Sequence, residues 1–320
     1  MIKIIIIFYL VFFTGLLFSK NNISENHKAI KNIQEIKMKI KSKTNKKKPL
    51  MDFVLASAFT THYGNSSYTK DGKDGSYSAS EHKLSLAVPI PIQKNKLFIL
   101  NGFDFTNLKA NNNSPNKIST TDRNFYSFSY NLGIIKVVKK QWTIFANIKP
   151  TLSSDFKEDI SSEDFIFQSS IFASKISKKN YTYGFGLSYT TRFGRPLLIP
   201  ILTYIYRTGN WNTKIILPAY ISQQYHFKNS KLGFSINLSG NNFNFKNDVS
   251  PKLDLDKLSY VRINIGPEYE LNIYKMLNLN IHAGITVYNK ISSADKKSNE
   301  ELNLSSNNKF FFRLGLKIIP

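Results

Sequence analysis

Residues 181–206 read YTYGFGLSYT, TRFGRP and LLIPILTYIY, and this stretch decides the fold. In its first ten residues the odd positions, from Tyr181 to Tyr189, are aromatic or leucine, and the even positions are Thr, Gly or Ser. Successive side chains of a strand point to opposite faces, so a strand here has one apolar face and one small or polar face. A second apolar run, 197–206, follows after a short break. Alternating segments of about ten residues separated by turns are typical of a transmembrane β-barrel.

The composition of the 320 residues fits the same fold. Hydrophobic residues make up 42% and aromatic residues 14% of the chain, yet the mean hydropathy is −0.26. This combination suits a barrel that turns apolar side chains to lipid and encloses a polar interior. The chain has no cysteine, which excludes disulfides and thiolate metal sites, and no cofactor is predicted. A formal charge of +23 is typical of nucleic-acid binding, but the basic residues are spread among turns and one amino-terminal segment, so we expect no nucleic-acid partner.

The first fifty residues differ from the rest of the chain. Lys3 precedes an apolar run from Ile4 to Phe18, which predicts a cleaved signal peptide at 1–19. A membrane anchor is the alternative, but the run is shorter than the ~20 residues of a spanning helix. Residues 20–50 carry ten lysines and only two acidic residues, which favours a lysine-rich periplasmic leader over a plug that enters the barrel.

Residues 51–320 are predicted to form the barrel. Strict alternation recurs in segments such as 126–134, 232–238, 277–287 and 310–318. We count fourteen strands, or twelve if the region around Pro218 is irregular. The sequence therefore predicts an all-β fold, an antiparallel transmembrane β-barrel of 12 to 14 strands, after a cleaved signal peptide and a basic leader.

The connections between the predicted strands alternate between long loops, such as 64–78 and 241–257, and tight turns. Outer-membrane barrels separate their outer loops from their periplasmic turns in this way, so we expect both ends of the barrel on the periplasmic side. Lysine and arginine dominate the short turns. The acidic residues of the long loops are Asp71, Asp74, Asp155, Glu158, Asp159, Glu163, Asp248, Asp254, Asp256, Asp295, Glu300 and Glu301. A soluble β-sandwich has no reason to sort its charges by connection length.

Four segments carry a resemblance to a known family: 150–156, 183–189, 192–200, and the pair Leu217-Pro218 before 240–242. They resemble a group of gram-negative outer-membrane barrel proteins described only as a domain of unknown function. The resemblance covers roughly residues 51–320 and implies a location in the bacterial outer membrane. It brings no activity and no functional residues.

That location implies particular partners. Outer-membrane lipid and lipopolysaccharide would surround the barrel, and the barrel-assembly machinery and periplasmic chaperones would act during insertion.

The sequence offers little chemistry. None of the five histidines is spaced like a metal ligand pair on one strand. Outer-membrane phospholipases need a serine and a histidine in a defined motif, and the nearest approach, His226 to Ser230, lies in a predicted turn without that motif. Paired carboxylates such as Glu158-Asp159 suit a divalent cation, but a solvated loop is the simpler interpretation. We therefore predict no catalytic residue and no metal site.

The polar face of the last three strands is the candidate functional surface. The lumen-lining residues predicted there are Arg262, Glu268, His282, Arg313 and Lys317. They form either a basic constriction that favours anions or a salt-bridge network that fills a narrow barrel. We expect a passive channel or transporter for small solutes. The alternatives are a structural or surface-interaction barrel with a closed lumen, and a carrier of hydrophobic solutes that residues 20–50 plug.

Overall fold

A computed structural model describes residues 53–320 except for 71–72, 94–95, 114–122, 139–140, 178–179, 246–255, 295–299 and 307–308. The predicted signal peptide and the predicted leader or plug lie outside the described residues. Apart from one short 3₁₀ turn, η2 (Ser162–Asp164), the described elements are strands. None of the helical segments in the described ranges is long and apolar enough to cross a membrane.

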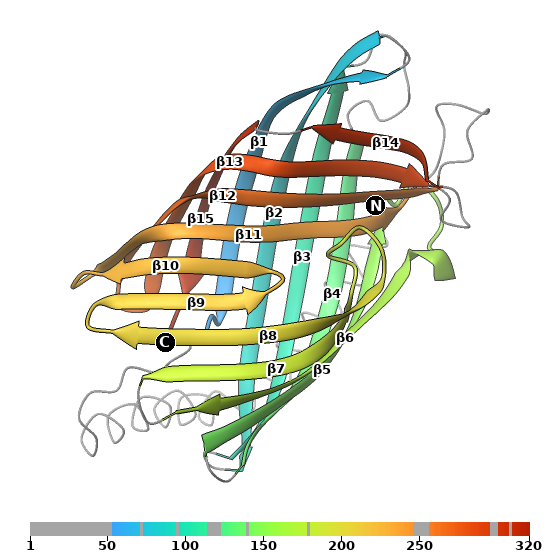
Figure 1. The fold of residues 1–320 in the computed structure, drawn as a ribbon. Helices are drawn as coiled ribbons and strands as arrows, with labels where there is room; N and C mark the ends of the chain where they lie inside the picture. Colours follow the sequence, from blue (N-terminus) through green and yellow to red (C-terminus); the bar gives the residue numbers. More distant parts are fainter. Residues whose placement is uncertain are drawn as a thin grey trace. The chain divides into compact units, whose positions relative to one another are not determined.

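Fifteen strands follow one another along the chain (Figure 1). Their bounds are β1 (Ala56–Lys70), β2 (Lys73–Gln93), β3 (Leu97–Asn113), β4 (Arg123–Val137), β5 (Trp142–Ser154), β6 (Phe165–Ile176), β7 (Tyr181–Thr190), β8 (Leu197–Thr208), β9 (Trp211–Leu217), β10 (Tyr220–His226), β11 (Ser230–Asn244), β12 (Lys257–Tyr274), β13 (Leu277–Ala294), β14 (Glu300–Ser306) and β15 (Lys309–Ile318).

The strands close into an antiparallel barrel. Each strand from β1 to β13 pairs with its neighbours in chain order, and β15 joins β13 to β1. β14 pairs with the far end of β13 and stands outside this ring, so fourteen of the fifteen strands form the wall. The predicted barrel and its fourteen strands are confirmed. The region around Pro218 is a hairpin of two strands, β9 and β10, rather than one irregular strand.

Ala56 pairs with Ile318, so the first and last barrel strands have their outer termini at the same end. We call this the turn end, because the tight turns lie there, and the opposite end the loop end. In outer-membrane barrels the short turns face the periplasm and the long loops face outward.

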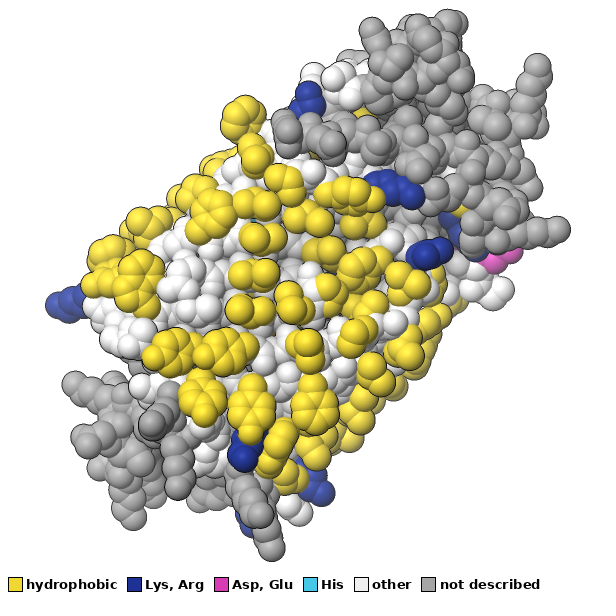
Figure 2. Space-filling view, in the orientation of Figure 1, with side chains coloured by type: hydrophobic (Ala, Val, Ile, Leu, Met, Phe, Trp, Pro, Cys, Tyr) yellow, Lys and Arg dark blue, Asp and Glu magenta, His cyan; other side chains and the backbone are white. Residues whose placement is uncertain are grey.

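The alternation that predicted the strands sets the direction of their side chains. In β7, Phe185 is 56% exposed on the outside, whereas Thr182 is buried on the inside. Figure 2 shows hydrophobic side chains spread over the visible wall. This apolar outer surface is the one that lipid would cover.

One predicted loop is largely strand. The predicted loop 64–78 is mostly the ends of β1 and β2, which pair as far as Lys70 and Lys73. Their backbone groups are satisfied within the ladder. Above the membrane, however, no lipid requires one apolar face, so the sequence lacks the alternation that marks the spanning segments.

The predicted alternation of long loops and tight turns is wrong at one place. β9 and β10 are joined at the loop-end side by Pro218 and Ala219 alone. Each strand has only seven residues, whereas the flanking β8 and β11 have twelve and fifteen. Figure 1 shows this short hairpin ending between its longer neighbours. At β9 and β10 the barrel wall therefore extends less far toward the loop end than at the neighbouring strands, and we call this part the low wall.

A second closure bridges the low wall. The ends of β5 and β11 pair in parallel at Ser154 and Asn244, and the Asp155 amide donates to the Asn244 carbonyl at 3.1 Å. Asn244 Nδ2 also donates to Asp164 Oδ1 in η2 at 2.9 Å. At the loop end the described wall thus contains β1–β5, β11–β13 and β15, which is nine strands, and β6–β10 end below it.

Candidate functional site in the barrel interior

The loop end of the interior holds a cluster of buried hydrophobic side chains, which we call the aromatic core. Its members are Tyr63, Ala79, Leu108, Phe125, Phe243, Phe245, Leu258, Tyr260 and Phe311. All lie on, or directly after, strands of the nine-strand ring. Phe125 and Phe243 have no exposed surface, and their ring centroids are 5.4 Å apart. Side chains can fill a barrel of about eight strands, and the core does so here.

Arg262 lies fully buried beside the aromatic core. Its guanidinium carbon lies 4.0 Å from the Tyr63 ring centroid and 4.6 Å from that of Tyr260. Its Nε donates to Asn289 Oδ1 at 3.1 Å, while Nη1 and Nη2 have no hydrogen-bond partner among the described residues. The Tyr260 hydroxyl donates to Glu81, which is also buried. The cation is thus held by two aromatic faces and one amide, with a carboxylate close by.

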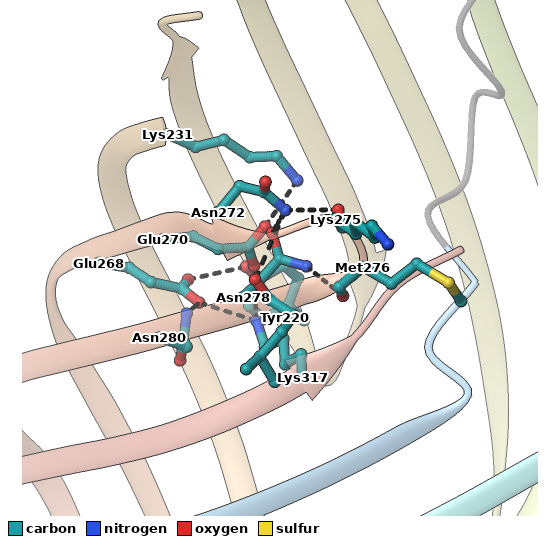
Figure 3. A network of polar contacts seen from close by, with 11 residues as sticks. Tyr220, Lys231, Glu268, Glu270, Asn272, Lys275, Met276, Asn278, Asn280 and Lys317 are labelled. Carbon is teal, nitrogen blue, oxygen red and sulfur yellow. Dashed lines mark hydrogen bonds and ion pairs between the residues drawn. The ribbon is translucent and has the colours of Figure 1, made fainter. Parts of the chain in front are cut away.

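A polar network occupies the turn end (Figure 3). Glu270 of β12 lies between two lysines, with Lys231 Nζ at 2.8 Å and Lys317 Nζ at 3.0 Å. Glu268 accepts from Asn280 Nδ2 at 2.8 Å and from the Tyr220 hydroxyl at 3.1 Å. Two carboxylates and two ammonium groups balance in charge. These groups therefore form a salt-bridge network rather than a basic constriction.

We expect Glu270→Gln to lower the free energy of unfolding by about 3 kcal/mol, because it leaves two partly buried ammonium groups with less compensation. Urea unfolding of the refolded barrel in detergent micelles measures this. The control is Asp159→Asn in an exposed loop, which should change stability by less than about 0.5 kcal/mol. Equal losses in both variants would show that the network does not stabilise the barrel.

His282 and Arg313 lie between the two zones. They face each other in the β13–β15 register, and the His282 ring lies 4.8 Å from that of Phe311 in the aromatic core. Arg313 Nε donates to Thr61 Oγ1 at 3.1 Å. His282 also pairs with Glu268 across β12 and β13, so a polar row joins the core to the turn-end network.

The five predicted lumen residues therefore do not form one site. Glu268 and Lys317 are 3.7 Å apart, and His282 and Arg313 adjoin them, whereas Arg262 belongs to the environment of the aromatic core. Sequence reasoning missed Glu270, Lys231 and Glu81. Glu270 could have been found, because it follows Glu268 by two residues on the same strand face. The contact of Glu81 with Tyr260 spans 179 residues and has no local signal.

The exposure of the interior charges differs between the zones. Toward the turn end and middle, the side chains of Lys83, Asp104 and Lys149 are 36%, 30% and 26% exposed. At the loop end, the ion pair of Arg123 and Asp155 is only 4% and 3% exposed. The middle of the lumen along β2, β3 and β5 is thus accessible to water, whereas the outer part is dry and Glu270 at the turn end is only 8% exposed.

No group of three or more potential metal ligands occurs among the residues that the structure describes. The exposed pair Glu158-Asp159 belongs to no such group.

Comparisons with solved structures return outer-membrane barrels of several kinds. An outer membrane channel from Pseudomonas putida F1 is 8% identical, with 86% of this chain and all of that chain covered and a TM-score of 0.42. The translocator domain of the autotransporter NalP from Neisseria meningitidis is 10% identical, with 92% and 97% covered and a TM-score of 0.34. The outer membrane phospholipase from Salmonella typhi is 10% identical, with 86% and 94% covered and a TM-score of 0.30. A channel, a translocator and an enzyme appear side by side, so no activity passes to this chain.

A comparison with curated proteins found no match. A family model, however, matches residues 52–318, nearly the whole described part of the chain. The chain belongs to the family "Domain of unknown function (DUF6268)".

Proposed function

We propose that the protein is a passive transporter of small solutes in the bacterial outer membrane, and that its outer mouth is closed in the conformation described. The observation that carries this proposal is the water-accessible middle of the lumen, where the side chains of Lys83 and Lys149 are 36% and 26% exposed. A barrel with a purely structural role needs no such space, because side chains can fill it.

The outer closure sets a clear expectation for electrical recordings. In planar bilayers, the refolded wild-type protein should show brief openings and no steady conductance, because the aromatic core fills the loop end. Vesicles that contain it should release small solutes faster than protein-free vesicles. A barrel that is folded, electrically silent and without solute flux would contradict transport.

A structural or surface-interaction barrel with a closed lumen is the second candidate. The dry aromatic core and the bridge between β5 and β11 favour it, since both seal the loop end. The two candidates differ in wild-type solute flux, which only a transporter shows.

We propose no catalytic role. The interior groups described above contact ion-pair partners, amides and aromatic faces, an arrangement that suits structure and solute passage. The partners expected from the location remain proposals: outer-membrane lipid and lipopolysaccharide around the wall, and the barrel-assembly machinery and periplasmic chaperones during insertion.

A further inference from the structure

The low part of the wall contains a break in the hydrogen-bond ladder. β8 pairs with β9 only from Leu202 onward, and β11 pairs with β10 only up to Asn237. The β9–β10 hairpin ends before it reaches the loop-end parts of its two neighbours. Residues 197–201 of β8 therefore have no β9 partner, and residues 239–243 of β11 have no β10 partner. The backbone-to-backbone bonds of these two segments run to β7 and β12, on their other sides, and the Asn242 carbonyl also accepts from Ser153 Oγ of β5 at 2.7 Å.

Such a break is costly within a membrane. Lipid cannot hydrogen-bond the backbone, so irregular or unpaired backbone at membrane depth occurs where protein covers it or where it lines a hydrated passage. The break lies beside spanning wall, since Leu198 and Leu202 of β8 are 66% and 54% exposed on the outside. Pro200 has no amide hydrogen. It lies in the part of β8 that has no β9 partner, where a missing donor is tolerated.

The connection between β7 and β8, residues 191–196, covers the break, and we call it the covering loop. Its Gly194 carbonyl accepts from Asn242 Nδ2 at 3.2 Å, and its Arg192 carbonyl lies against Gly240 with no room for a β-carbon. The loop reaches across β11 as far as Ser259 of β12. These contacts consist of one side-chain hydrogen bond and van der Waals packing, without a backbone ladder. The covering loop can therefore separate from β11 at a smaller cost than any strand of the wall.

The inner face next to the break is apolar, which is unusual for a lumen. Thr203 and Ile205 are buried inside, so alternation places Leu197, Ile199 and Ile201 on the same inner face. Ile216 of β9, opposite Thr203, continues this patch. The neighbouring strand β7 instead presents Thr, Gly and Ser inward. β8 is thus apolar on both faces along the break.

From these observations we infer a lateral gate. Small apolar or amphiphilic solutes pass between the inner lumen and the outer leaflet through the break, and the covering loop closes it. The inference rests on the proposed transport function and names its route and solute class. It also explains how a lumen whose outer mouth is filled by side chains carries solutes at all.

A disulfide tether tests the gate. A β-carbon built on Gly194 lies 3.4 Å from the Ser259 β-carbon, and disulfides join β-carbons about 3.5–4.5 Å apart. The chain has no cysteine, so Gly194→Cys with Ser259→Cys gives a single possible bridge. Gly194 has φ +76°, so a cysteine there carries backbone strain, which is equal in the oxidised and reduced forms.

The readout is uptake by cells that carry the variant in the outer membrane. The apolar probe is 1-N-phenylnaphthylamine, a dye that fluoresces in membranes, and the polar probe is nitrocefin, cleaved by a periplasmic β-lactamase. We expect oxidation to reduce dye uptake to the level of cells without the protein, and reduction to restore it. Mass spectrometry of the purified barrel verifies the bridge.

The other outcomes separate two failures. Dye uptake that exceeds the protein-free level and is the same in both redox states overturns the gate but leaves transport standing. Uptake of both probes at the protein-free level overturns transport, and the gate with it.

A second variant tests the solute class. Ile199→Thr with Ile201→Thr keeps β-branched side chains while making the inner face polar, and we expect it to lower dye uptake. The matched control is Leu198→Thr with Leu202→Thr, on the lipid face of the same strand, which should leave uptake unchanged. An equal loss of dye uptake in the two double variants would contradict passage of the solute over the inner face of β8.

Discussion

Truncation of the aromatic core by Phe125→Ala and Phe243→Ala is expected to turn brief openings into steady ion conductance in planar bilayers. The two rings are fully buried and touch each other, so their removal leaves a void across the loop end. Each change should also lower the free energy of unfolding by about 3–5 kcal/mol. Because the residues are in contact, the double variant should lose less than the sum of the two.

The matched control removes two phenylalanines from the lipid face. Phe185 and Phe234 are 56% and 50% exposed on the outside of β7 and β11. Their replacement by alanine should leave the conductance of the barrel unchanged. A core variant that folds, as shown by different gel migration of boiled and unboiled samples, and yet stays silent would show that the aromatic core is not the outer closure.

Replacement of Arg262 by Met should lower the free energy of unfolding by at least as much as Glu270→Gln does. Removal of one member of a buried charged group costs about 3–5 kcal/mol, since the remaining charge is left uncompensated. We expect a value near the lower end, because Lys83 lies 3.0 Å from Glu81 and still offsets its charge. Urea unfolding of the refolded barrel measures the loss.

A double-mutant cycle isolates the cause. Glu81→Gln combined with Arg262→Met removes both charges, so the pair should lose less than the sum of the single changes. Arg313→Met is the comparison at a partly exposed arginine, and its loss should be smaller. Additive losses at Glu81 and Arg262 would mean that the two charges do not interact.

The membrane-spanning wall could be predicted from the sequence because lipid imposes a simple rule on it. One face of every spanning strand must be apolar, and segments such as 181–190 and 310–318 record this with a period of two. The hairpin of β1 and β2 continues beyond the spanning region, where lipid imposes no apolar face, so its outer half gave no such signal.

The interior could be predicted only in part. Alternation identified Glu268 and Lys317 as side chains on one face, and the structure brings their charges to 3.7 Å. The environment of Arg262 depends on Tyr63 and Glu81, which lie roughly 200 residues earlier in the chain. The short β9–β10 hairpin was within reach of sequence reasoning, because Pro218 and its two seven-residue flanks leave no room for a long loop.

The pairing of Ser154 with Asn244 has a consequence for the order of folding. Closure of the wall joins β1 to β15, whereas the bridge joins β5 to β11 across the ninety positions that separate the two residues in sequence. The bridge needs β6–β10 to be arranged first, since they lie between its two ends, and contacts of long sequence separation form late. The molecule therefore closes twice, and because the β1–β15 junction joins Ala56 to Ile318, a far longer separation than that of the bridge, a folding barrel passes through a state in which its outer rim is bridged while the seam of the cylinder is still open.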